Sequence, residues 1–354
     1  MASKRGKTYF SYLVNLVCVV LLFIVLTALM KAGVINTYWA GVIMLIMINI
    51  ILATSLNLTT GVLGQIALGH AGFMSVGAYA AAIFSMKIAE AAKLVEKGAP
   101  TAAGFGTFLA SLVVAGVVAA IFGLIVGIPA LRLKGDYLAI ITLGFGEIIR
   151  VIIENVEFTG GAQGLSGIPK LSNFNTVYWV TALTIAVLFA FGRSRHGRAI
   201  IAIREDDIAS EASGIPNTYY KVLAFTISAF FAGVAGAVYA QQMQVLGAKT
   251  FNFMRSIDIL VIVVLGGLGS LTGSIIAAVG LTVLPEALRG FSEYRMLIYS
   301  VALIVVMIFK PSGLLGTREF SMSSLLRWLR HPQFKRKKRR LKGGAANEQS
   351  CSES

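Results

Sequence analysis

Glu147 and Arg150 are oppositely charged residues that lie three positions apart within the apolar segment 137–153. Residues three apart share one face of a helix, so we expect the carboxylate and the guanidinium to meet. At about 1.5 Å of rise per residue from Asp136, Glu147 would lie about 16 Å into a bilayer, where an unpaired charge is costly. The two residues are therefore either a structural ion pair between helices or a group that contacts a zwitterionic substrate or relays a proton.

Gln65 and His70 are two further polar residues in an apolar setting, because they fall in the glycine-rich stretch 61–77. Its glycines are explained most simply by close packing between helix backbones. A polar side chain inside a bilayer is costly unless it faces the bundle or a cavity. We therefore expect Gln65 or His70 to line a path for a substrate.

The connection between residues 193 and 217 carries the signals of a short helix outside the membrane. Glu205, Asp206 and Asp207 suit the positive end of a helix dipole, and Gly214 followed by Pro216 suits the end of a helix. We therefore expect a short helix between these two groups of residues.

This expected helix has an apolar stripe, because Ile208, Ala212 and Ile215 recur at intervals of four and three. A stripe on a helix that has no lipid to enter needs protein to cover it. The connection is therefore either a docking element for a partner protein or a connector that folds back on its own bundle.

Patterns typical of catalysis are missing. The phosphate-binding loop G-x-x-x-x-G-K-[ST] is incomplete, because Gly6-Lys7-Thr8 matches its end but the position five residues before Gly6 is Met1. There is no H-E-x-x-H or G-x-S-x-G pattern, the three histidines are scattered, and the two cysteines show no metal-ligand spacing. We expect no enzyme activity, no metal site and no cofactor.

The elements that would position these residues are membrane-spanning helices. Hydrophobic types supply 56% of the 354 residues and charged types 13%, whereas a soluble domain has about 25% charged residues. The sequence predicts an all-α polytopic membrane protein with about 8–10 transmembrane helices. The apolar segments cover approximately 10–30, 38–56, 65–86, 105–128, 137–153, 177–192, 219–240, 256–288 and 294–309.

The segment 256–288 is too long for one crossing, because its 33 residues would form a helix of about 50 Å against a bilayer core of about 30 Å. Its middle contains Gly266, Gly267, Gly269 and Gly273, and glycines weaken a helix at that point. We predict two arms joined at these glycines. Exposed backbone inside a membrane is tolerated only in protein or beside water, so the break suggests a transport path. The stretches 61–77 and 266–273 also resemble each other, which suggests an internal repeat.

Charge distribution predicts that both termini are cytoplasmic. With the returning arm at 266–273, 21 of the 31 Lys and Arg residues fall inside and nine outside, which agrees with the positive-inside rule. Residues 1–309 would form the membrane domain, with 193–217 as a cytoplasmic loop, and residues 310–354 a basic, largely disordered tail. Attached to a membrane bundle, this tail is better suited to anionic lipid than to nucleic acid.

Several motifs together resemble one family. The loop residues Glu211-Ala212-Ser213-Gly214 resemble the "EAA" coupling loop of ABC importer permeases. With the other motifs the chain resembles LivM-type permeases of branched-chain amino acid uptake, over about Thr60 to Gly316. Those motifs are Gly64-Gln65-Ile66-Ala67-Leu68-Gly69-His70-Ala71-Gly72, Leu143-Gly144-Phe145-Gly146-Glu147-Ile148-Ile149-Arg150, Thr159-Gly160-Gly161 and Gly266-Gly267-Leu268-Gly269-Ser270.

The resemblance implies a multi-pass protein of the cell membrane that works in a complex. The expected partners are two ABC ATPase subunits, a second LivH-like permease and an external solute-binding protein. The same family includes permeases for urea and short amides, so these substrates remain an alternative to Leu, Ile and Val. An ATP-independent secondary transporter or channel, or a membrane scaffold without transport, would also fit the apolar helices but would leave the coupling loop unexplained.

Overall fold

The computed structural model describes residues 2–33, 35–91, 102–133, 135–290, 294–310, 313–314 and 316. Residues 35–319 form one compact unit, and residues 1–34 belong to another. The helix of the latter is α1 (Ala2–Lys31). The predicted disorder of the basic tail concerns residues that, from 317 onward, lie outside the described part of the chain.

The regular structure in the described residues of this unit is helical apart from one short two-stranded sheet, in which β1 (Leu165–Ser166) pairs antiparallel with β2 (Val245–Leu246). Its α-helices are α2 (Thr37–Asn57), α3 (His70–Ala91), α4 (Ala102–Ala130), α5 (Asp136–Asn155), α6 (Phe174–Arg193), α7 (Arg195–Glu205), α8 (Asp207–Ala212), α9 (Asn217–Met243), α10 (Phe253–Gly266), α11 (Leu271–Ala287) and α12 (Arg295–Phe309). A π-helical turn, η1 (Leu58–Val62), continues α2, and short 3₁₀ turns lie at η3 (Glu157–Thr159), η4 (Gly161–Gln163), η5 (Ala248–Phe251) and η6 (Leu288–Gly290). This confirms the predicted all-α class.

Six helical segments are long and apolar enough to cross a membrane among the described residues: 37–62, 70–88, 104–130, 174–193, 217–243 and 271–290. This is fewer than the predicted 8–10 helices. The helix α5 has the length of a span but carries four charged residues, and α10 and α12 have only 14 and 15 residues. The predicted segment 65–86 also begins too early, because the chain is irregular before His70.

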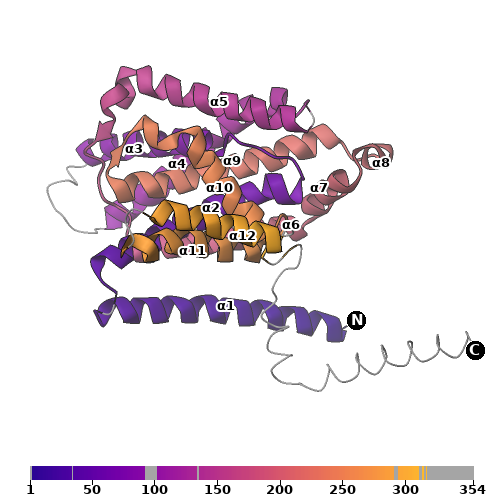
Figure 1. The fold of residues 1–354 in the computed structure, drawn as a ribbon, viewed down its shortest axis with the longest axis horizontal. Helices are drawn as coiled ribbons and strands as arrows, with labels where there is room; N and C mark the ends of the chain where they lie inside the picture. Colours follow the sequence, from indigo (N-terminus) through magenta and orange to yellow (C-terminus); the bar gives the residue numbers. More distant parts are fainter. Residues whose placement is uncertain are drawn as a thin grey trace, which may run out of the picture. The chain divides into compact units, whose positions relative to one another are not determined.

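The helices α3, α4 and α9 pack closely against one another (Figure 1). At the crossing of α3 and α9, a Cβ atom added to Gly77 would lie 2.3 Å from the Cα of Gly233. Such a distance is shorter than any packed contact, so the two backbones touch directly, as small residues allow in membrane helices. The outward face of α4 is apolar, with Phe105, Val113 and Ile125 exposed, which suits lipid.

The predicted break in segment 256–288 is confirmed. The helix α10 ends at Gly266, Gly267 and Gly269 have φ values of +110° and +87°, and α11 begins at Leu271. Left-handed φ values favour glycine because it has no Cβ atom. The two arms touch at Gly266 and Gly273, where a Cβ atom on Gly266 would lie 2.6 Å from the carbonyl carbon of Gly273.

Candidate functional site: a capped surface loop and a charged helix face

The connection 193–217 folds into two helices, α7 and α8, which lie at one end of the bundle (Figure 1). The side chain of Ser194 accepts a hydrogen bond from the Gly197 backbone at the start of α7. One carboxylate oxygen of Asp206 accepts hydrogen bonds from the backbone N–H groups of Ile208 and Ala209, at 2.9 and 3.0 Å. The acidic residues therefore cap a short helix as predicted, and Gly214 follows its end with φ of +85°.

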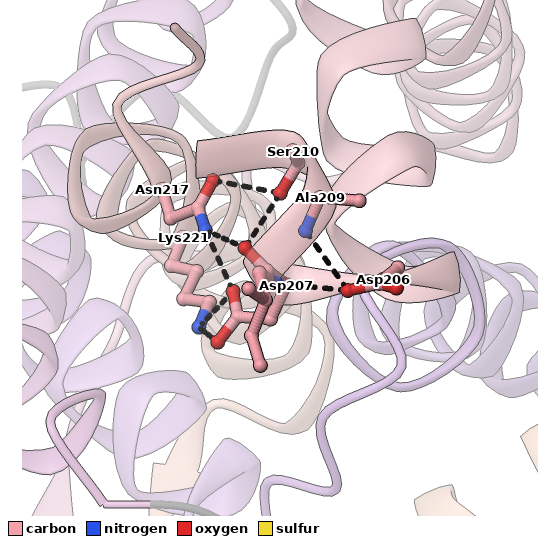
Figure 2. Close-up of polar contacts among 7 residues, drawn as sticks. Asp206, Asp207, Ala209, Ser210, Asn217 and Lys221 are labelled. Carbon is pink, nitrogen blue, oxygen red and sulfur yellow. Dashed lines mark hydrogen bonds and ion pairs between the residues drawn. The ribbon is translucent and has the colours of Figure 1, made fainter. Parts of the chain in front are cut away.

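The helix α8 is tied to the first turns of α9 by a polar cluster (Figure 2). The Lys221 ammonium lies 2.9 and 3.0 Å from the two carboxylate oxygens of Asp207. The amide nitrogen of Asn217 donates to the backbone carbonyl of Asp207 at 2.6 Å and to its carboxylate at 2.9 Å. The Ser210 hydroxyl donates to the Asn217 side-chain oxygen at 3.0 Å. These bonds fix a helix of six residues that would be too short to be stable alone.

The predicted apolar stripe divides between two environments. Ile208 is 79% exposed, and Ala212 is also exposed on α8. Ile215 instead packs against the buried cluster that contains Ile200 and Ile203 of α7. The stripe therefore combines features of both alternatives: its C-terminal member, Ile215, packs on its own bundle, and Ile208 and Ala212 remain exposed.

The helix α5 carries three charged residues on one face, one more than the sequence argument found. The Arg150 guanidinium contacts Glu147 at 2.7 Å through Nε and Glu154 at 2.7 Å through Nη1. The predicted contact between Glu147 and Arg150 is confirmed, and Glu154 gives the group a net charge of −1. The three side chains are 29%, 22% and 24% exposed for Glu147, Arg150 and Glu154, respectively. The group is thus neither buried in the bundle nor fully open.

Glycines bring α5 close to the start of α3. A Cβ atom on Gly69 would lie 2.3 Å from the Thr142 carbonyl oxygen, and one on Gly72 would lie 2.8 Å from the Cα of Gly146. The Thr142 hydroxyl also accepts a hydrogen bond from the Leu68 backbone at 3.0 Å. These contacts place Glu147 beside a shallow hollow, whose lining also includes Leu68, Gly72, Asn252 and Ser256.

Gln65 and His70 have different surroundings. His70 is 3% exposed, and its Nε2 atom lies 2.9 Å from the Ser55 hydroxyl of α2. Gln65 lies in the irregular chain between η1 and α3, with its side-chain oxygen buried and without a hydrogen-bond partner among the described residues. Of the two, Gln65 is the better candidate for a group that meets a substrate, while His70 packs between helices.

Two polar contacts that connect distant parts of the sequence were not anticipated. Arg255 donates to the Asn49 side-chain oxygen at 2.7 Å, and Asn49 donates to Thr282, so α10, α2 and α11 are joined inside the bundle. The second contact is a hydrogen bond from Arg204 to Gly61. Arg255 lies one residue before the predicted segment 256–288, and a cation that flanks an apolar segment is common. The sequence spacing does not indicate its partner, so the contact was missed. In the described part of the chain, no group of three His, Cys, Asp or Glu side chains is placed to bind a metal ion.

A bundle of apolar helices with glycine-broken segments, and a helical loop at one end of the bundle, defines a multi-span membrane protein. Residues 38–309 match the family described as "Branched-chain amino acid transport system / permease component". The chain therefore belongs to this family, whose members are transport subunits and not enzymes.

Named relatives agree with this assignment. The chain is 40% identical over 304 residues to the LivM permease protein of the high-affinity branched-chain amino acid transport system of Salmonella typhimurium, covering 76% of this chain and 68% of that one. It is 38% identical to LivM of Escherichia coli K12, with coverages of 77% and 68%. Identity to the LivH permease protein of the same organism is 28%, covering 76% of this chain and 91% of that one. No solved structure matches the chain.

Proposed function

We propose that the chain is one of two unlike permease subunits of an ATP-driven importer for Leu, Ile and Val. The loop 193–217 and both termini face the cytoplasm, where two ATPase subunits bind, and a solute-binding protein delivers the substrate on the opposite side. The similarity to LivM proteins of high-affinity branched-chain amino acid systems supports the substrate. The similarity to LivH supports a second permease of related fold.

The observation that carries this proposal is the exposed helix α8. It is capped by Asp206, anchored to α9 by Asp207, and presents Ile208 to solvent with 79% of its surface exposed. An apolar side chain on a rigid helix outside the lipid suits docking into a groove of another protein. Glu205 at the end of α7 and Glu211 on α8 are also exposed and would set the charge of the contact.

The charged face of α5 supports a protein neighbour within the membrane. Glu147, Arg150 and Glu154 lie in a helix whose face also exposes apolar residues such as Ile148 and Val151. Charged groups at this depth are costly against lipid, so this face is covered by the second permease or lines a water-filled path. In this proposal, Glu147 and Gln65 belong to the path, and the surplus carboxylate favours the ammonium group of an amino acid.

Uptake of labelled leucine tests the substrate. Cells lacking the gene and complemented cells are compared, with unlabelled valine, isoleucine, alanine and urea as competitors. The proposal predicts gene-dependent leucine uptake that valine and isoleucine inhibit and urea does not. Inhibition by urea alone would favour the urea or amide alternative. Uptake that persists without the ATPases and stops when ion gradients are dissipated would favour a secondary transporter.

Co-purification tests the docking role of α8. We expect Ile208→Asp to abolish recovery of the ATPase subunits with the permease. The matched control is Val245→Asp, because Val245 is 57% exposed on β2 just beyond the far end of α9. The 27 residues of α9 correspond to about 40 Å, so the control places the same new charge far from α8. Equal recovery of the ATPases with both variants would contradict the proposal.

A further inference from the structure

Arg204 lies in the last turn of α7, two residues before the Asp206 cap of α8. Its Nη1 atom donates a hydrogen bond to the backbone carbonyl of Gly61 at 2.7 Å, across 143 positions of sequence. Gly61 belongs to the π-helical turn η1, where α2 loses its regular geometry. A guanidinium is a strong donor for a carbonyl that a broken helix leaves without its ordinary partner.

The aliphatic part and the guanidinium group of Arg204 occupy space beside glycines that have no Cβ atom. A Cβ atom on Gly64, which has φ of +77°, would lie 2.8 Å from the Arg204 Cγ atom. One on Gly269, which has φ of +87°, would lie 3.3 Å from Nη1. The arginine therefore passes beside the irregular chain that leads to α3 and reaches the break between α10 and α11. Side chains at either glycine would displace it.

The two glycine breaks also contact each other at this point. The Asn57 side-chain oxygen accepts a hydrogen bond from the Gly269 backbone N–H at 2.9 Å. A Cβ atom on Gly61 would lie 2.2 Å from the Gly269 nitrogen. Three segments thus meet within one hydrogen-bonded cluster: the end of α2, the break between α10 and α11, and the end of α7. Of these three, only α7 continues directly into the exposed helix α8.

In this arrangement, a movement of α8 is passed through α7 directly to the two glycine breaks, Gly61–Gly64 and Gly267–Gly269. The helix α8 begins at the residue after its cap, Asp206, so it is joined to α7 without a flexible linker. The residues that receive the Arg204 side chain are glycines in left-handed or π-helical backbone, where dihedral angles can change at low cost. Movement at such positions redirects the helices that follow, as hinges do.

We propose that Arg204 is the positioning residue that couples movement of α7 and α8 to the glycine breaks at Gly61–Gly64 and Gly267–Gly269, and so to opening of the path. This rests on the proposed function, because it requires α8 to be the site on which the ATPases act. Arg204 does not contact the substrate in this proposal. It links the ATPase cycle to the helices that line the path.

The test uses the complete transporter in proteoliposomes and measures both ATP hydrolysis and leucine uptake. We expect Arg204→Gln to retain bound ATPases and ATP hydrolysis while leucine transported per ATP falls at least about fivefold, the lower end of typical coupling between sites. Arg204→Lys keeps the charge but loses the planar fork, so a smaller fall is expected. If the glutamine variant does not assemble, leucine transported per ATP is measured with the lysine variant instead.

Arg198→Gln is the matched control. Arg198 lies on the same helix, is exposed, and donates to the nearby Arg193 carbonyl at 3.0 Å. Its variant should transport as many molecules per ATP as the unmodified complex. An unchanged ratio in the Arg204 variants, or ATP hydrolysis and transport falling by the same factor, would overturn the proposal. Failure of the unmodified permease to bind ATPases would instead overturn the proposed function itself.

Discussion

The Lys221 ammonium lies between the two carboxylate oxygens of Asp207, at 2.9 and 3.0 Å, and so joins the second turn of α9 to the first residue of α8. The Lys221 side chain is only 10% exposed, whereas that of Asp207 is 31% exposed. The Lys221 ammonium therefore depends on Asp207 for a partner more than Asp207, which water can reach, depends on Lys221. This asymmetry determines which substitution is more harmful.

Asp207→Ala should destabilise the permease by about 2 kcal/mol, because it leaves a nearly buried ammonium without its acceptor. Lys221→Met should cost less, since Asp207 keeps its bonds from Asn217 and reaches solvent. The melting temperatures of the two purified variants in detergent give the comparison. A lower melting temperature for Lys221→Met than for Asp207→Ala would show that the assignment of the dependent partner is wrong.

Asp206→Ala should loosen α8 by about 1 kcal/mol, the usual cost of losing a side-chain cap at a helix N-terminus. The two backbone N–H groups that Asp206 serves belong to Ile208 and Ala209. Hydrogen exchange of peptides covering 207–213 should accelerate about fivefold, which corresponds to that free energy. Glu211→Ala, an exposed change on the same helix, is the control and should leave the exchange as it is.

Gly77→Ala should destabilise the bundle by about 1–3 kcal/mol, as overpacking typically does. The added Cβ atom would collide with backbone atoms of Gly233, which cannot rotate away as a side chain can. Gly280→Ala on α11 is the matched control, because nothing lies within 4 Å of its added Cβ atom. Thermal unfolding should separate the two. Equal melting temperatures would mean that α3 and α9 do not pack through their glycines.

Glu147→Gln should raise the KM for leucine uptake more than Glu154→Gln does. Each variant leaves Arg150 with one carboxylate partner, because each removes one of its two ion pairs. Of the two glutamates, only Glu147 lines the hollow beside Leu68 and Gly72. Initial uptake rates over a range of leucine concentrations, normalised to the amount of permease, provide the measurement. Identical effects of the two variants would assign the group a structural role.

Reversing the charges of Glu147 and Arg150 is a poorer test, although their spacing suggests it. A glutamate at position 150 would stand four residues from Glu154 on the same helix face. Like charges at that spacing repel each other. The reversed pair would therefore lose stability for a reason unrelated to substrate, and the single glutamine variants avoid this.

Local chemistry explains which features could be predicted from the sequence. The break at 266–273 follows from glycines in a segment that is too long to cross once, and the Glu147–Arg150 contact follows from helical spacing. The start of α8 follows from acidic residues that can cap a helix. In each case the interacting groups lie within a few residues of one another, so the sequence itself brings them together.

Features that depend on packing between distant segments were missed. Glycines on α3 predicted close contact but not the partner, and the approach of Gly69 to Thr142 is set by the position of α5. The hydrogen bond from Arg204 to Gly61 joins two elements that lie far apart in the sequence, and no pattern in either segment predicts this contact. Ile215 fits the periodicity of an exposed stripe, yet it is held inward by Ile200 and Ile203. Six of the predicted 8–10 spans meet the length and composition of a crossing in the described residues, because hydropathy alone does not distinguish short helices such as α10 and α12 from complete crossings.

The length of α9 has a consequence for the membrane in which the protein works. Its 27 residues extend over about 40 Å, whereas the hydrocarbon core measures about 30 Å. A helix that exceeds the bilayer tilts or protrudes, and α9 carries Asn217 and Lys221 in its first turns. If α8 lies at the cytoplasmic end of α9, as proposed, acyl chain length sets the height of α8 above the lipid, and with it the position of Ile208 relative to the proposed ATPase partner.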